Sequence, residues 1–154
     1  MKKILVAADV ATHPCVAGNT QCIMQYVENL RTIGADVYYL LIGSQEILKK
    51  TIETTRGYWG NRFFYYPLPL WQKLSMKIYK KFTKQSYPND VDFYVPWGLV
   101  NYVNSLHSTY HFDGLIVNYI WQSRLAQCHI PIKALYTHDI FAYRDERLDA
   151  GKYW

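Results

Sequence analysis

Two almost uninterrupted apolar runs, Lys3–Ala8 and Asp36–Ile42, constrain the fold of this chain most. Runs this poor in polar side chains are typical of strands that are buried on both faces. Between them, Thr20–Ile33 repeats its apolar residues at helical spacing, and Gly34 provides a helix stop. A strand-helix-strand unit of this length predicts a right-handed crossover and two parallel strands.

The alternation of strand and helix continues along the whole chain. Further strands are expected at Arg62–Tyr66, Asp113–Asn118 and Ile132–Tyr136. Further helices are expected at Ser44–Thr54, Leu70–Lys84, Trp97–Tyr110 and Trp121–Cys128, with Thr55–Asn61 and Ser86–Pro96 as loops. This pattern predicts an α/β fold: a Rossmann-like, open, mainly parallel sheet with helices on both faces.

Length, charge and cysteine content limit which kind of protein this is and which partners it binds. A chain of 154 residues suits one domain. The net charge of +5 favours anionic partners: a phosphorylated ligand, an acidic membrane face or nucleic acid. Nucleic-acid binding has only charge in its favour, without a ribonucleoprotein or zinc-finger pattern, and is not expected. Three cysteines without metal-ligand spacing indicate free thiols in a reducing compartment, and neither a signal peptide nor a membrane span is apparent.

The loop after the first strand is the first candidate site. Asn19 is a plausible N-cap for the following helix, whose first turn would present free N–H groups to an anion. Gly18 would let a ligand approach the backbone, and His13 could contact a phosphate. The loop lacks both G-x-G-x-x-G and G-K-[ST], so a complete nucleotide site is not indicated. The alternative is that Gly18 serves only the turn and that His13 is a solvated loop residue.

The second candidate site follows the fifth strand, which we expect to be central in the sheet. Thr137-His138-Asp139 and Arg144 would lie at its carboxyl end, where open α/β sheets bind ligands. His138 could act as a general base or donate to a developing negative charge, with Asp139 beside it in the sequence. Arg144 could hold a phosphate or a carboxylate. The alternative is a structural His138 and an Asp139 that caps the next helix.

Asn118 ends the fourth strand and is expected at the same edge of the sheet. The aromatic residues that follow, Tyr119 and Trp121, could stack on a sugar ring or serve only in packing.

The predicted helix Leu70–Lys84 is the third candidate site. Apolar residues cover one side of it and lysines the neighbouring side, as in a helix that lies on an anionic membrane or faces an acceptor. The residues concerned are Trp71, Lys73, Lys77, Lys80 and Lys84. The alternative is an ordinary amphipathic helix that packs on the sheet with its lysines in solvent.

Two local patterns carry a resemblance to a known family. The opening strand, His13-Pro14, Gly18-Asn19, a helix and then Gly34-Ala-Asp-Val37 resemble the start of retaining glycosyltransferases of family 4, which have the GT-B fold. The family usually has Gly-His-x-Val before the second strand, and this chain has Ala35 in place of the histidine. Leu135-Tyr-Thr-His-Asp-Ile-Phe141 with Arg144 resembles the Thr-His-Asp segment of the same enzymes.

The resemblance implies an N-terminal, acceptor-side lobe of a longer two-domain protein. Gly18 would approach the donor diphosphate, and His138 would contact the transferred sugar or the reacting groups. Asp139 and Arg144 match the motif without a defined role. The basic helix resembles the membrane-facing helix that some relatives use to reach lipid-linked acceptors. The lobe that holds the nucleotide-sugar and the Glu-x7-Glu motif is expected outside this chain, so the isolated domain should be inactive.

We therefore expect a transferase that moves a sugar from a nucleotide-sugar to a glycan or lipid-linked acceptor in cell-envelope polysaccharide synthesis. The donor is a substrate, and neither a metal nor a cofactor is expected. The location would be cytoplasmic, with peripheral contact at the inner face of the membrane. The alternative is a non-catalytic, flavodoxin-like module that binds a phosphorylated ligand.

Overall fold

The apolar runs of the sequence form one parallel sheet. The computed structural model describes residues 1–43, 48–83 and 94–137. Its strands are β1 (Lys3–Ala8), β2 (Asp36–Ile42), β3 (Phe63–Tyr66), β4 (Gly114–Asn118) and β5 (Ile132–Tyr136). They pair in the order β3-β2-β1-β4-β5, and every pair is parallel. The predicted bounds of β1, β2 and β5 are confirmed, and β3 and β4 begin one residue later than predicted.

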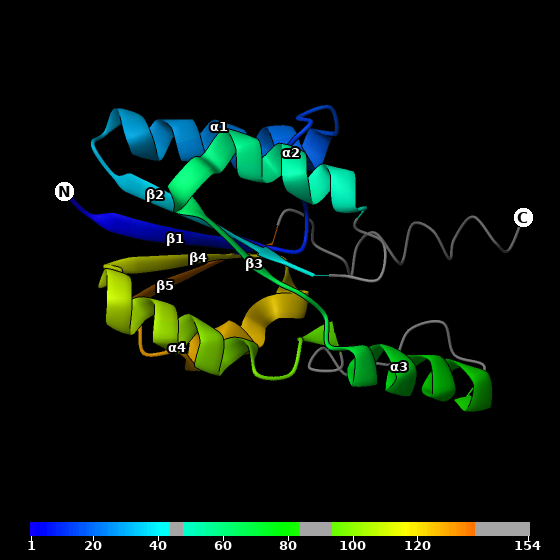
Figure 1. Ribbon diagram of the computed structural model, residues 1–154. Helices are drawn as coiled ribbons and strands as arrows, with labels where there is room; N and C mark the ends of the chain where they lie inside the picture. Colours follow the sequence, from blue (N-terminus) through cyan, green and yellow to red (C-terminus); the bar gives the residue numbers. More distant parts are fainter. Residues whose placement is uncertain (44–47, 84–93, 138–154) are drawn as a thin grey trace, which may run out of the picture.

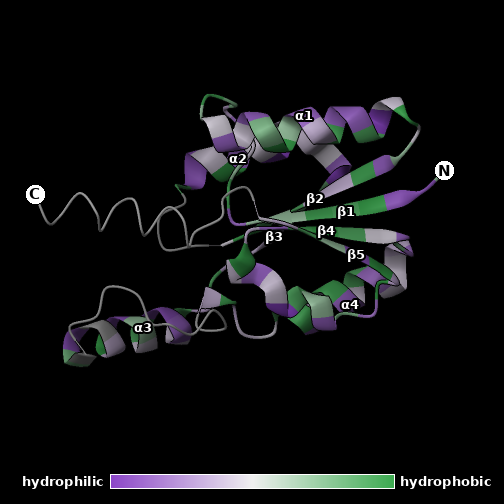
Figure 2. Cartoon of the chain, turned by 180° about the vertical axis from the view of Figure 1, so that it is seen from behind, coloured by the Kyte–Doolittle hydropathy of each residue, from purple (hydrophilic) through white to green (hydrophobic). Residues whose placement is uncertain are grey.

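Helices cover both faces of this sheet, as predicted (Figure 1). Helices α1 (Gly18–Thr32) and α2 (Lys49–Trp59) lie on one face, and α4 (Leu99–Tyr110) lies on the other with the 3-10 helix η3 (Ile120–Gln127). A short 3-10 turn, η1 (Gly60–Arg62), leads from α2 into β3. Helix α3 (Leu70–Thr83) extends away from these layers in both ribbon views (Figures 1 and 2). The fold is therefore an open α/β sandwich with one protruding helix.

The side-chain alternation of β1 divides the core into two halves. Leu5 and Ala7 pack toward α4, whereas Val6 and Ala8 pack toward α1 and α2. Successive residues of a strand point to opposite faces, so a strand covered on both sides must be apolar throughout. All four residues are fully buried, which explains the uninterrupted apolar run.

Helix α2 departs from the prediction. We expected a helix over Ser44–Thr54 and a loop over Thr55–Asn61, but the helix runs over Lys49–Trp59, and residues 44–47 lie outside the described ranges. Thr55 and Trp59, one helical turn apart, are both buried. Tertiary burial of these two side chains thus sustains the helix through a segment whose polar residues and Gly57 suggested a loop. The helix ends at Gly60, which has a positive φ.

The ends of α1 correct one expectation and confirm another. Asn19 was predicted as the N-cap, but the cap is Ala17, and Asn19 lies inside the first turn. The Asn19 side chain accepts a hydrogen bond from the Thr20 N–H at 2.8 Å, and the Thr20 hydroxyl donates to the Ala17 carbonyl at 2.7 Å. At the other end Gly34 has φ +87° and donates to Arg31, which confirms it as the helix stop.

Two further corrections concern the last elements. The predicted helix Trp121–Cys128 is a 3-10 helix over Ile120–Gln127. Strand β5, expected in the centre, is an edge strand of the described sheet, and all five of its residues are exposed. The order is set by tertiary pairing: β2 and β3 extend from one side of β1, while β4 and β5 extend from the other.

Candidate functional site

The strand order reverses between β1 and β4, and this point defines the candidate site. From β1 the chain continues to β2 and β3 on one side, and it then returns to β4 on the other side. Open α/β sheets bind ligands outside the carboxyl ends of the strands at such a reversal, because the connections there diverge and leave a crevice. Asp9 directly follows β1, and Asn118 ends β4. The site is therefore framed by these two residues.

Asp9 is a site residue that our sequence reasoning missed. Its side chain is half-buried, and burial raises the pKa of its carboxyl above the ordinary value, with only a hydrogen bond from its own backbone N–H opposing the shift. Within the described ranges, no lysine, arginine or histidine forms an ion pair with it. A desolvated carboxyl without a cation at a ligand-binding edge is a functional candidate. The available signal was an acidic residue placed immediately after a fully apolar strand.

Asn118 fixes the end of β4 to its neighbours. Its amide is fully buried, and Nδ2 donates to the Ala7 carbonyl at 3.1 Å and to the Tyr26 hydroxyl at 2.8 Å. The same hydroxyl lies 3.0 Å from Asn118 Oδ1, and burial raises the pKa of Tyr26. The structure thus places Asn118 at the predicted edge, with its amide engaged in holding β4, β1 and α1 together.

Aromatic residues lie at the same edge of the sheet as Asp9 and Asn118. Tyr119 has φ +69°, which is uncommon for a residue with a side chain, and its N–H donates to the Tyr136 carbonyl at 2.9 Å. The rings of Tyr26 and Tyr136 lie 5.4 Å apart. Unusual backbone angles of this kind cluster at functional sites. A carboxyl next to tyrosines offers hydrogen-bond acceptance and an aromatic face, which together suit a sugar.

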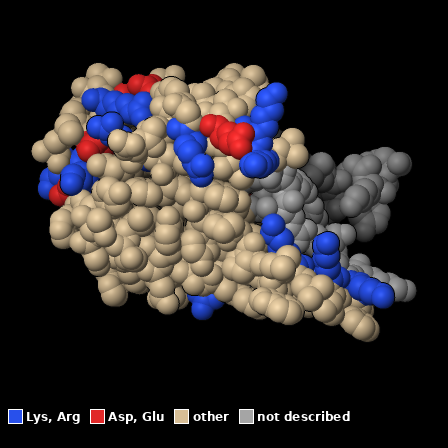
Figure 3. Space-filling view, in the orientation of Figure 1, with Lys and Arg blue, Asp and Glu red and all other residues tan. Residues whose placement is uncertain are grey.

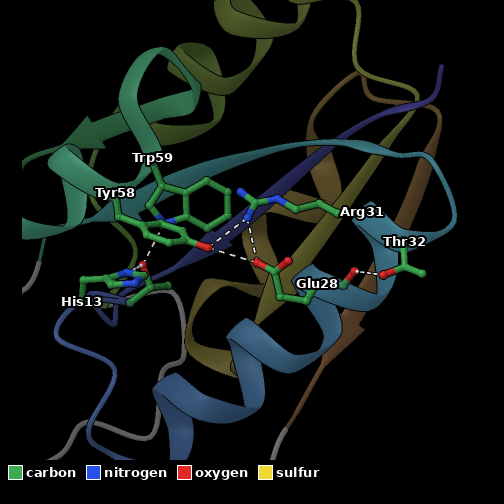
Figure 4. A network of polar contacts seen from close by, with 7 residues as sticks. His13, Glu28, Arg31, Thr32, Tyr58 and Trp59 are labelled. Atoms are coloured by element: carbon green, nitrogen blue, oxygen red, sulfur yellow. Dashed lines mark hydrogen bonds and ion pairs between the residues drawn. The ribbon is translucent and has the colours of Figure 1, made fainter.

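His13 anchors the β1–α1 loop to α2 (Figure 4). Its ring stacks on Tyr58 with 3.8 Å between the centroids, and its Nδ1 lies 3.1 Å from the Thr12 hydroxyl oxygen. That oxygen accepts the Trp59 indole N–H at 2.8 Å, so the Thr12 hydrogen is available to His13 Nδ1. Burial lowers the pKa of His13. The histidine is therefore held in a structural network and favours its neutral form.

The same network joins α1 to α2. Tyr58 donates to Glu28 at 3.0 Å, and Arg31 donates to Glu28 at 2.8 Å and to the Tyr58 hydroxyl at 3.0 Å (Figure 4). The Arg31 guanidinium also lies 4.7 Å from the centre of the Trp59 ring. The Arg31 guanidinium is thus already paired and stacked.

Gly18 begins α1 at the same edge of the sheet. A Cβ at this position would meet no atom within 4 Å, and its φ is not positive. Neither packing nor backbone angle therefore requires a glycine here. A ligand that approaches the backbone N–H groups remains a prediction for this position.

The remaining predicted site residues lie either outside the described residues or on α3. His138, Asp139, Arg144 and Lys84 lie outside the described residues. Trp71, Lys73, Lys77 and Lys80 belong to α3, which extends away from the sheet in the ribbon view (Figure 1). The structure thus does not bring the α3 residues together with the β1–β4 crevice.

Other groups in the described ranges bear on cofactors and redox chemistry. No group of three His, Cys, Asp or Glu side chains there is arranged to hold a metal ion. Cys15, Cys22 and Cys128 are free thiols, and Cys128 is buried. None of the described helices is long and apolar enough to cross a membrane.

Comparison with known proteins does not identify a relative: no family model, no curated protein and no solved structure matches this chain.

Proposed function

We propose that this chain is the acceptor-side domain of a retaining glycosyltransferase that moves a sugar from a nucleotide-sugar to an acceptor in glycan or cell-envelope polysaccharide synthesis. The observation that carries the proposal is the reversal of strand order between β1 and β4. There the desolvated Asp9 carboxyl, without an ion pair among the described residues, lies at the same edge of the sheet as Tyr119 and Tyr136. In the sequence, Thr137-His138-Asp139 directly follows β5. Supporting it is the order of sequence motifs that resembles family 4.

The strand order helps to decide between this function and the alternative module. A flavodoxin-like sheet has the order 2-1-3-4-5, whereas this sheet has the order 3-2-1-4-5, which matches the first five strands of the Rossmann order 3-2-1-4-5-6. A phosphate directly against an ionised Asp9 would be repelled, so a diphosphate is assigned to the first turn of α1 and not to the position beside Asp9. Neutral sugar hydroxyls, in contrast, would donate hydrogen bonds to that carboxylate. Both points favour a carbohydrate acceptor beside Asp9.

The proposed reaction assigns a separate role to Asp9, to the first turn of α1 and to the segment after β5. The bond between the sugar C1 and the diphosphate oxygen breaks, and C1 bonds to the acceptor oxygen on the same face. Asp9 accepts a hydrogen bond from the acceptor hydroxyl and aligns it. The first turn of α1 stabilises negative charge on the departing diphosphate, which takes up the proton released by the hydroxyl. His138 contacts the transferred sugar, and Asp139 and Arg144 complete the segment.

The proposal also assigns a place in the cell. Lipid-linked acceptors of envelope synthesis lie in the membrane, so the enzyme would act in the cytoplasm with peripheral contact at the inner face. The nucleotide-sugar would be bound largely by a second domain that carries the Glu-x7-Glu motif.

The test is a sugar-transfer assay of the gene product that contains this chain. Purified protein is incubated with a panel of radiolabelled nucleotide-sugars and either a soluble glycan or a lipid extract as acceptor. We expect Asp9→Asn and His138→Ala each to lower the rate by at least about a hundredfold. Glu53→Gln, which removes an exposed carboxylate from α2, is the matched control and should leave the rate unchanged. Wild-type rates in both site variants would refute the assignment.

A further inference from the structure

Helix α3 exposes a continuous apolar stripe. Leu70, Leu74, Ile78 and Phe82 recur every four residues and therefore lie along one side of the helix. All four are exposed, Phe82 at 80%, and the neighbouring Trp71 is exposed at 73%. Single exposed apolar residues are ordinary, but a row of four with a tryptophan beside it is not. The sequence left open whether this side packs on the sheet, and the structure shows that it does not.

The opposite side of α3 fixes the orientation of the stripe. Gln72 and Met76 are buried. The Gln72 side chain donates from Nε2 to the Val95 carbonyl and accepts the Trp97 N–H at Oε1, both at 2.8 Å. A buried amide with both ends bonded is costly to displace. The outward direction of Trp71 and Leu70 is therefore built into the fold.

Lysines flank this apolar stripe. Lys73, Lys77 and Lys81 follow one another at the same four-residue spacing, and α3 contains neither Asp nor Glu. The space-filling view shows basic side chains along this helix (Figure 3). We call the stripe together with Trp71 and these three lysines the α3 surface. Its charge requires an anionic partner.

The combination of apolar side chains and lysines on the α3 surface favours one kind of partner. A second copy of the chain would bring lysines against lysines, which is repulsive. An acidic peptide would satisfy the lysines and leave a row of large apolar residues to cover. An anionic bilayer satisfies both, because Trp, Phe and Leu enter the boundary between headgroups and acyl chains while lysines reach the phosphates.

We propose that the α3 surface binds the surface of a bilayer that contains anionic phospholipid. The helix follows the carboxyl end of β3, so the membrane would lie on the side of the sheet at which β1 and β4 also end (Figure 1). Lipid binding stands on α3 alone. Its consequence, that the acceptor reaches the crevice from the membrane, rests on the proposed function.

The test is vesicle co-sedimentation of the full chain. One set of vesicles is phosphatidylcholine, and the other contains equal parts of phosphatidylcholine and phosphatidylglycerol. We expect binding to the anionic set and its loss at high salt. Replacing Lys73, Lys77 and Lys81 with Gln should lower the affinity about a hundredfold, at roughly fivefold per lysine near the surface. The triple replacement of Lys49, Lys50 and Lys133, exposed lysines of α2 and β5, is the matched control and should bind like the wild type.

A second pair of variants tests the apolar part of the surface. Trp71→Ser with Phe82→Ser should abolish sedimentation, while Ile33→Ser with Leu48→Ser, exposed apolar residues elsewhere, should not. Equal binding to both vesicle sets, or equal binding of the two lysine variants, would overturn the proposal. So would a dimer in analytical ultracentrifugation that dissociates when Trp71 and Phe82 are replaced. Transfer to a soluble acceptor is measured separately, so failure of lipid binding and failure of the transferase assignment are distinguishable.

Discussion

At the scale of single residues, Asp9 has a charge that its surroundings do not stabilise. Burial raises its pKa, so the native state binds the proton more tightly than the unfolded chain does. Stability contributed by the protonated form is therefore present at low pH and falls as pH rises from the unfolded value of 3.8 through the folded pKa. A natural sequence retains such a cost chiefly at a functional position.

The raised pKa of Asp9 leads to a prediction for the variant Asp9→Asn. The variant should be more stable than the wild type at neutral pH, since it never carries the desolvated charge, and the difference should vanish below the unfolded pKa. Urea denaturation across acidic and neutral pH measures it. Glu53→Gln, at an exposed carboxyl, should show no such pH-dependent gain. A less stable Asp9→Asn at neutral pH would contradict the view that this carboxyl is unpaired.

At the scale of elements, two glycines illustrate when a helix needs glycine. Gly98 precedes α4 with φ +79°, and an added Cβ would lie 2.8 Å from the Tyr66 hydroxyl oxygen. That hydroxyl donates to the Trp97 carbonyl. Gly57 lies inside α2, has ordinary helical geometry and has no atom within 4 Å of an added Cβ. The same substitution should therefore have opposite effects at the two positions.

We expect Gly98→Ala to lower the free energy of unfolding by about 1–3 kcal/mol, because it combines backbone strain with displacement of Tyr66. Gly57→Ala should raise it by roughly 0.5–1 kcal/mol, because alanine loses less backbone entropy in a helix. Thermal or urea unfolding measures both. A neutral Gly98→Ala would show that α4 does not begin in the left-handed conformation described here.

At the scale of the whole molecule, stability should decrease outward from β1. This strand pairs with both β2 and β4, and its residues Leu5–Ala8 are fully buried. Strand β5 pairs with β4 in the described sheet, and its side chains are exposed. Amides that open only on global unfolding exchange slowest. We expect the protection of β1 against hydrogen exchange to exceed that of β5 by at least about a hundredfold, and equal protection would contradict this gradient.

Sequence reasoning reached the strands and most helices but not every boundary. Apolar runs locate β1 and β2 because a strand buried on two faces leaves almost no choice of residue. Helix α2 was misplaced because its decisive contacts, the burial of Thr55 and Trp59, are made with distant parts of the chain. Asn118 was expected at the carboxyl edge of the sheet and lies there, whereas Asp9 was missed because its burial without an ion pair among the described residues is a property of the packed structure.

By itself, the sequence of this protein determined the α/β class, the positions of its buried strands and the row of apolar and basic residues on α3, since these follow from local periodicity. Only the tertiary structure decided the strand order, the reversal between β1 and β4, and the outward direction of the α3 stripe. Each of the latter depends on contacts between residues far apart in the chain, such as those of Gln72 with Val95 and Trp97. Periodicity tells which side of a helix is apolar, and packing decides whether that side is covered.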